Sequence, residues 1–123
     1  MRDEKKRLML LRTKRFALAV IRLYASLSRA TVEQVLGKQV LRSATSVGAH
    51  YREACRAKSN ADFISKIEGA LQELDETVYW LELLEESGTA KPDQTAPLAV
   101  EANELIAIFV SVVRAVRALT NTR

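Results

Sequence analysis

Apolar residues recur at alternating spacings of three and four along four stretches of the chain, and this pattern most narrows what the chain can fold into. Such spacing places apolar side chains on one face of an α-helix and is the seam spacing of helix bundles. The last stretch shows it most clearly, with Leu98, Ala102, Leu105, Phe109, Val112, Val116 and Leu119. Two prolines and four glycines are all that interrupt 123 residues rich in helix-forming side chains. The sequence therefore predicts an all-α protein.

The four helices are expected at about residues 3–28, 32–57, 60–87 and 95–120. Ser59, with Asp62 three residues later, predicts the start of the third helix, and Gly88 followed by Pro92 predicts its end. Rods of this length, roughly 30–40 Å, joined by short loops predict an antiparallel up-down-up-down four-helix bundle in a single domain. The sequence leaves open whether residues 1–12 form a loose basic arm.

The inward faces of the first three helices follow from the same spacing. We expect the core to contain Phe16, Val20, Leu23 and Leu27 from the first helix, Leu36, Val40, Val47, Tyr51 and Ala54 from the second, and Phe63, Ile67, Leu71, Leu74, Val78 and Leu81 from the third. The middle of the second face is unusually small, around Ser43 and Gly48.

Charge is unevenly distributed along the chain. Residues 1–15 and 38–58 are basic, whereas residues 62–104 carry eleven acids against two lysines. The basic segments either bind a polyanion or are neutralised by the acidic helix, within or between subunits. The candidate nucleic-acid contacts are Lys5, Lys6, Arg7, Arg12, Lys14, Arg15, Arg42, Arg52, Arg56 and Lys58. Tyr51 is the one aromatic residue in the second basic segment, so binding would be directed at phosphates and sensitive to salt.

The sequence offers no recognisable catalytic constellation. His50 and Cys55 stand five residues apart, about 140° around a helix, so they do not converge on one metal or substrate. Zinc-ligand spacing, a Glu-x-x-His pair and a glycine-rich phosphate loop are all absent. We therefore expect no catalytic residue, no cofactor, no metal and no enzymatic activity.

The expected compartment is the cytoplasm, without a membrane partner. One cysteine fits a reducing environment. The longest apolar run, residues 105–113, is about half the length of a membrane span.

The third and fourth helices carry more apolar residues than one seam uses. Such a wide stripe either thickens the core or forms a second contact surface. For a small protein the simplest partner is another copy of itself. The candidate oligomer interface is Ile64, Tyr79, Trp80 and Leu83.

Several motifs resemble a known family. They are RSATSVGA (residues 42–49), REA (52–54), Ser59 with DFISK (62–66), and ALQELDETVYWLELL (70–84). Together they resemble the bacterial four-helix-bundle proteins related to the 23S rRNA intervening-sequence protein. That family favours Asn where this chain has His50. Because histidine can change its protonation and asparagine cannot, a contact at this position could depend on pH.

The family is similar in fold to the accessory proteins of diversity-generating retroelements, which are basic, ring-shaped homopentamers that bind nucleic acid and a reverse transcriptase. The resemblance implies a homopentameric ring, contact with RNA or DNA, and a protein partner such as a reverse transcriptase. The number five comes from the resemblance and not from the residues. The alternative is a protein-interaction scaffold or accessory subunit with no direct nucleic-acid contact.

Overall fold

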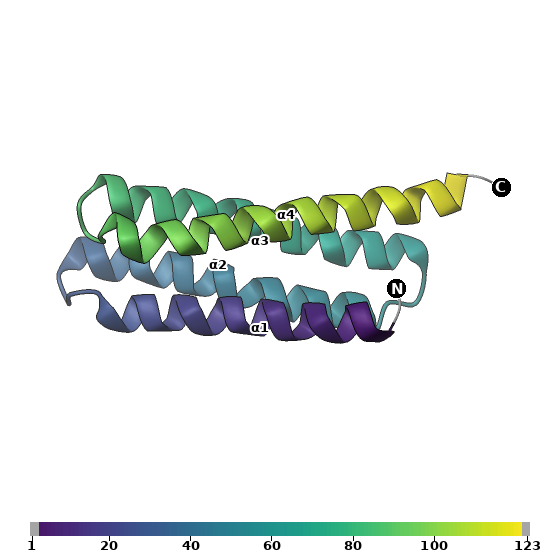
Figure 1. Ribbon diagram of the computed structural model, residues 1–123, viewed down its shortest axis with the longest axis horizontal. Helices are drawn as coiled ribbons and strands as arrows, with labels where there is room; N and C mark the ends of the chain where they lie inside the picture. The colour runs from purple at the N-terminus through teal and green to yellow at the C-terminus, as the bar shows by residue number, and fades with distance from the viewer. Residues whose placement is uncertain (1–2, 122–123) are drawn as a thin grey trace.

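Four long helices account for nearly all of the residues that the structure, a computed structural model, describes, which are residues 3–121. They are α1 (Asp3–Ser26), α2 (Thr31–Cys55), α3 (Asn60–Glu86) and α4 (Pro92–Asn121). Figure 1 shows them running alternately up and down, so that both ends of the chain lie at the same end of the bundle. Among the described residues there is no strand. The predicted fold class, an antiparallel four-helix bundle, is confirmed.

The helix ends lie close to their expected positions, with one exception at α4. Gly88 has a φ of 77° and ends α3, because the N–H groups of Thr89 and Gly88 donate to the carbonyls of Leu84 and Glu85 at 3.0 Å. This is the hydrogen-bond pattern of a Schellman cap. Helix α4 then begins at Pro92 and not at residue 95. Proline suits the first turn of a helix, because the N–H that it lacks has no intrahelical partner there.

From residue 3 onward, the segment that the sequence left open as a loose basic arm is helical. Residues 3–12 belong to α1, and residues 1–2 lie outside the described part. The apolar spacing of α1 continues back through Thr13 to Met9, and both side chains are buried. The hydroxyl of Thr13 donates to the carbonyl oxygen of Met9 at 2.9 Å, so its polar atom is satisfied inside the bundle. The arm is helical because it contributes to the core.

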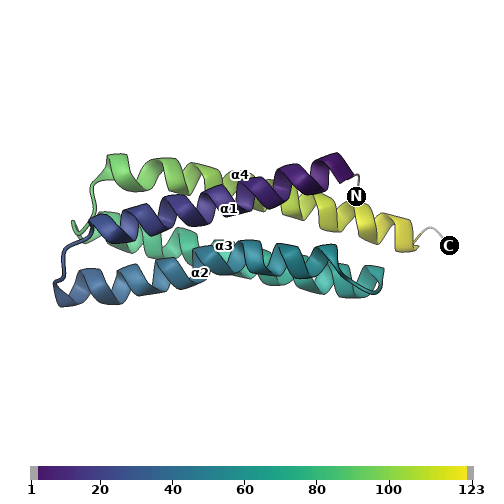
Figure 2. The same cartoon turned by 90° about the horizontal axis from the view of Figure 1, so that it is seen from below.

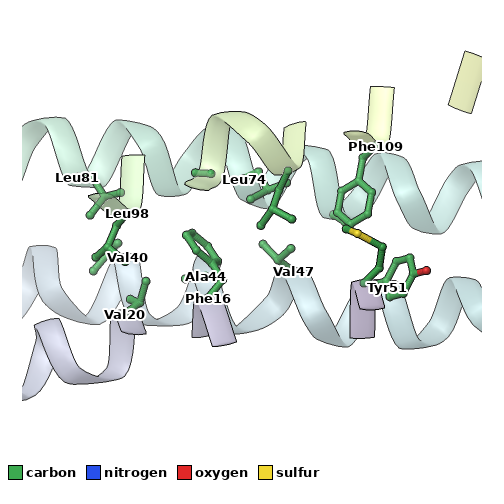
Figure 3. Packing of buried hydrophobic residues seen from close by; sticks show 14 of the residues in the cluster. Phe16, Val20, Val40, Ala44, Val47, Tyr51, Leu74, Leu81, Leu98 and Phe109 are labelled. Atoms are coloured by element: carbon green, nitrogen blue, oxygen red, sulfur yellow. The ribbon is translucent and has the colours of Figure 1, made fainter. Parts of the chain in front are cut away.

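Small residues let α2 pack closely against its neighbours. The hydroxyls of Ser43 on α2 and Thr77 on α3 lie 2.8 Å apart and are buried. A Cβ on Gly48 would lie 3.4 Å from the hydroxyl of Thr13 on α1. Apolar side chains from all four helices fill the centre, as Figure 3 shows for Val20, Val40, Leu74 and Leu98 among others. The small middle of α2 therefore has a packing role.

The core ends earlier along α4 than its sequence spacing predicts. Leu98, Ala102, Leu105 and Phe109 are buried as expected, but Leu119 is 68% exposed, while Val112 and Val116 are half-buried. Val113 is buried instead. Of the helix pairs in contact, α1 and α4 touch least, and Figure 1 shows the distance between them widening toward the chain ends. The last turns of α4 therefore lack a helix to cover their seam.

Helix α4 is also more apolar than its longest uninterrupted run indicated. By length and composition, Pro92–Thr120 could cross a membrane, with a mean hydropathy of 1.7 over its most apolar 18 residues. In the bundle, 28% of that window is buried. The expectation based on residues 105–113 alone therefore understated the apolar character of this helix, and much of its apolar surface is left uncovered in a single chain.

The predicted cap of α3 gives a stability test. The hydroxyl of Ser59 accepts the N–H of Asp62 at 3.0 Å, and the Asp62 carboxylate accepts the N–H of Lys58 at 3.2 Å. Ser59→Ala should therefore lower the free energy of unfolding by about 1 kcal/mol in urea titrations. Ser65→Ala, at an exposed position inside the same helix, is the control and should change it little. Equal losses in both variants would show that this cap contributes nothing.

Candidate nucleic-acid interface

The antiparallel topology converts charge blocks along the chain into a charge separation along the bundle axis. The half that contains the chain ends comprises residues 3–15, 46–68 and 104–121, with twelve Lys or Arg against six Asp or Glu. The opposite half, residues 16–45 and 69–103, has five against nine. In the view of Figure 1 these halves lie at opposite ends of the long axis. One end is therefore net positive by six and the other net negative by four.

Nine of the ten candidate cations lie at the positive end, and Arg12 differs from the other eight because it is paired with acids. Of those eight, seven have exposed side chains and Lys6 is half-buried. Within residues 3–121 none of the eight forms an ion pair. We call this set the basic end: Lys5, Lys6, Arg7, Lys14, Arg15, Arg52, Arg56 and Lys58.

The other two candidates are neutralised by acids of the same chain. Arg12 on α1 makes a two-pronged contact with Glu101 on α4, Nε to Oε2 at 2.7 Å and Nη2 to Oε1 at 2.8 Å, and reaches Glu104 at 3.3 Å. Hydrogen bonding of the Arg12 guanidinium to the Glu101 carboxylate, which accepts, is the main cause that raises the pKa of Arg12 above its usual range.

Arg42 on α2 contacts α3 in the same way. Its guanidinium lies 2.8 Å from a carboxylate oxygen of Glu76 and 3.5 Å from one of Glu73. The sequence left open whether the basic residues are neutralised by acids or bind a polyanion. Acids of the same chain neutralise Arg12 and Arg42, whereas the eight cations of the basic end have no such partner within residues 3–121.

His50 and Cys55 face different parts of the molecule. The imidazole of His50 lies against α3, where a Cβ on Gly69 would be 3.1 Å from the ring. Its Nδ1 is 3.3 Å from Glu53 and its Nε2 is 3.8 Å from Glu73. Cys55 instead lines a groove between α1 and α4. The described residues contain no group of three His, Cys, Asp or Glu side chains placed to hold a metal ion.

Sequence reasoning missed that groove. It has a volume of about 1530 Å³ and lies between the N-terminal half of α1 and the C-terminal half of α4. At its base Tyr51 stacks on Phe109 with ring centroids 5.6 Å apart. Figure 3 draws both side chains among the buried residues. Burial is the main cause that raises the pKa of Tyr51, and the neighbouring Cys55 raises it further. The signal in the sequence was the seam of α4 continuing past Phe109, which we assigned to the core.

The four candidate interface residues on α3 differ in exposure. Tyr79 is 53% exposed and lies 5.2 Å from Trp80, centroid to centroid. Ile64 and Trp80 are half-buried and pack against the core, and Leu83 is half-buried as well. Within one chain, Tyr79 is therefore the member of this set most available to a partner.

The fold and its charge separation define a class of protein: a small all-α four-helix bundle with one basic end. The model of the 23S rRNA-intervening sequence protein family matches residues 6–111, and the chain belongs to that family.

Among solved structures, the chain is similar to a crystal structure at 1.70 Å of a protein with unknown function from the S23 ribosomal protein family of Bacteroides thetaiotaomicron VPI-5482. The two are 37% identical with a TM-score of 0.83, and the match covers 89% of this chain and 98% of the other. A comparison with curated proteins finds no significant match. Neither description names an enzymatic activity.

Proposed function

We propose that this chain is a non-enzymatic, homo-oligomeric protein that binds the phosphate backbone of RNA through its basic end. One observation carries the proposal: eight cations gather at one end of the bundle, and none of them forms an ion pair with an acid of residues 3–121. Phosphate contacts from Lys and Arg release counterions from the nucleic acid, and this supplies most of the affinity of backbone-directed binding. The names of the family and of the structural relative refer to 23S rRNA and to a ribosomal protein family, which makes RNA the first ligand to test.

Binding of this kind reads shape and charge, not bases. Sequence reading in single strands uses aromatic side chains that stack on bases. Tyr51, the aromatic residue of the second basic segment, is fully buried against Phe109 and does not reach a ligand. We therefore expect similar affinities for structured RNAs of different sequence, and duplex DNA as a weaker or equal competitor.

Fluorescence anisotropy tests this function. A labelled RNA hairpin and a DNA duplex of equal length would be titrated with the protein from about 50 to 200 mM salt, the range over which phosphate-directed binding falls steeply. Log affinity should fall linearly with log salt. An absence of binding at the lowest salt would contradict the proposal and favour the alternative, a protein-interaction scaffold. The apolar groove between α1 and α4 is the observation that supports that alternative.

The oligomer we propose is a homopentameric ring, on the similarity in fold to the accessory proteins of diversity-generating retroelements. A heterologous contact between basic surface on one subunit and acidic surface on the next closes a ring and repeats the basic end around it. Several weak phosphate sites held together bind far more tightly than one. That similarity also makes a reverse transcriptase the first protein partner to test.

Light scattering at micromolar concentration should give a mass of roughly 68 kDa, five times the 13.7 kDa chain. Tyr79→Glu places a charge on the exposed candidate interface residue and should yield smaller species that remain helical. The control is Gln72→Glu, which adds a charge at another exposed position on α3. A wild-type protein that stays monomeric at these concentrations would contradict the ring.

A further inference from the structure

The groove between α1 and α4 is open and has apolar residues on both of its walls. Leu8 and Leu11 stand on its α1 wall and are 57% and 42% exposed. The α4 wall carries Ile108, Val112, Val116 and Leu119. Exposed apolar surface that is contiguous over two helices is characteristic of an interaction site.

The α4 wall has the spacing of a helix seam without the helix that would cover it. Val112, Val116 and Leu119 continue the alternation of three and four that buries Leu105 and Phe109. Because α1 diverges from α4 toward the chain ends (Figure 1, with the same helices seen from below in Figure 2), no helix within residues 3–121 fully covers Val112 and Val116. Because spacing of three and four is the spacing that packs against another helix, the ligand that best fits this surface is a helix.

The size of the groove agrees with that assignment. Along α1 its lining runs from Asp3 to Arg15, about 18 Å of helix, so an occupant of about 13 residues or three to four turns would span it. This is a common length for a helix that docks into a groove through anchors one turn apart.

The rim of the groove specifies the charge of the occupant. Lys5, Lys6 and Arg15 project from α1, and Lys58 projects from the α2–α3 turn. Asp3 and Glu101 also line the groove, but Glu101 is held by Arg12. The charge left for a ligand is positive, so its complement is acidic.

A second copy of this chain fits the groove poorly. If two copies docked symmetrically through this face, the same cations would lie against each other. The acidic face of α3 offers Asp75, Glu82 and Glu86 with a single exposed apolar residue among them, Tyr79. A nucleic-acid backbone would match the rim but would leave the apolar walls uncovered.

We propose that this groove binds an amphipathic helix of a partner protein, with an apolar stripe directed into the groove and acidic residues along its flanks. The apolar stripe would complete the α4 seam, and the acids would meet the lysines and Arg15 at the rim. Lys5, Lys6, Arg15 and Lys58 belong to both the groove rim and the basic end, whereas Arg52 and Arg56 do not line the groove. Substitutions at Arg52 and Arg56 therefore distinguish this interaction from RNA binding.

The test uses a synthetic fluorescent peptide of about fourteen residues, with leucines at positions i, i+3, i+7 and i+10 and glutamates on the flanks. A peptide of the same composition with scrambled leucine positions is the control ligand. We expect the amphipathic peptide to bind at least about tenfold more tightly than the scrambled one. Cys55, the one cysteine of the chain, is half-buried on the groove lining, so bound peptide should also slow its reaction with a thiol reagent.

A matched pair of variants locates the binding. Leu11 and Leu18 are each 42% exposed on α1, but Leu11 lines the groove and Leu18 does not. Leu11→Glu should weaken peptide binding by about tenfold or more, whereas Leu18→Glu should leave it unchanged, with equal helical circular dichroism. Arg52→Glu with Arg56→Glu should leave peptide binding intact while weakening RNA binding, so the two proposals fail separately.

Three outcomes would overturn the proposal. One is amphipathic peptide binding that is no tighter than scrambled, or equal in the Leu11→Glu and Leu18→Glu variants. Another is a wild-type oligomer that binds no peptide and protects Cys55 by itself, which would assign the groove to a second copy. The third is RNA that protects Cys55 and loses affinity in Leu11→Glu while the peptide does not bind, which would assign the groove to nucleic acid.

Discussion

Replacing Phe109 with alanine should lower the free energy of unfolding by about 3–5 kcal/mol, which is a large share of the stability of a small domain. Phe109 is fully buried and stacks on Tyr51 of α2 with an interplanar angle of 18°. This pair joins α2 and α4 at the base of the groove. Because Phe109 is fully enclosed, its truncation leaves a cavity that the surrounding side chains fill only in part.

Urea titration at a fixed protein concentration measures this effect, because oligomerisation would make stability depend on concentration. Tyr79→Ala is the control, since it removes an aromatic ring that is 53% exposed and should cost less than about 1 kcal/mol. If Phe109→Ala does not fold, Phe109→Leu provides a milder variant with the same direction. A similar loss for the buried and the exposed aromatic residue would contradict the packing described for this end of the bundle.

Reversing Arg52 and Arg56 to glutamate should weaken binding to every RNA tested by roughly 60-fold at 0.1 M salt. The figure follows from two lost phosphate contacts, each worth about 0.9 in the slope of log affinity against log salt, taken from a 1 M reference. Both side chains are exposed and form no ion pair within residues 3–121. Folding should therefore be unaffected, which circular dichroism would check.

The matched control reverses two cations at the other end of the bundle. Arg22 and Arg29 are also exposed, and Arg22→Glu with Arg29→Glu changes the net charge by the same amount. If position matters and not total charge, this control should lose far less affinity than the Arg52 and Arg56 variant. Equal losses would mean that binding follows net charge alone and that the basic end is not the interface.

The fold could be predicted from the sequence because its determinants are local. Alternating spacing placed Val20, Val40, Leu74 and Leu105 on inward faces, and each is buried. Ser59 and Gly88 marked helix ends through hydrogen bonds that span a few residues, and the structure confirms both. Four long amphipathic rods with short loops then leave little choice but an antiparallel bundle.

The electrostatic part of the site could be predicted only in outline. Arg12 and Glu101 are 89 residues apart in the chain, so their pairing depends on how α1 crosses α4. Spacing likewise could not show that Arg42 is held by Glu73 and Glu76 while Arg52, ten residues away, forms no ion pair within residues 3–121. The composition indicated two basic segments, and the tertiary structure selects which cations remain for a ligand.

The groove could not be predicted for a related reason. Seam spacing shows which face of α4 is apolar but not whether another helix covers it. The pattern runs unchanged through Phe109, Val112 and Val116, whereas burial ends near Phe109 and returns at Val113. Beyond Phe109 the apolar spacing of α4 continues, but α1 no longer fully covers it. The same spacing that marks a buried core elsewhere in the chain therefore marks a partly exposed apolar surface here.

The salt dependence of RNA binding, measured for the wild type beside the Arg52→Glu and Arg56→Glu double variant, tests the central claim most directly. Log affinity for one labelled hairpin would be plotted against log salt for both proteins. If the basic end holds the phosphate backbone, both plots should be linear and the slope for the double variant should be shallower by about 2. Equal slopes, or a wild-type protein that binds no RNA at about 50 mM salt, would contradict the account.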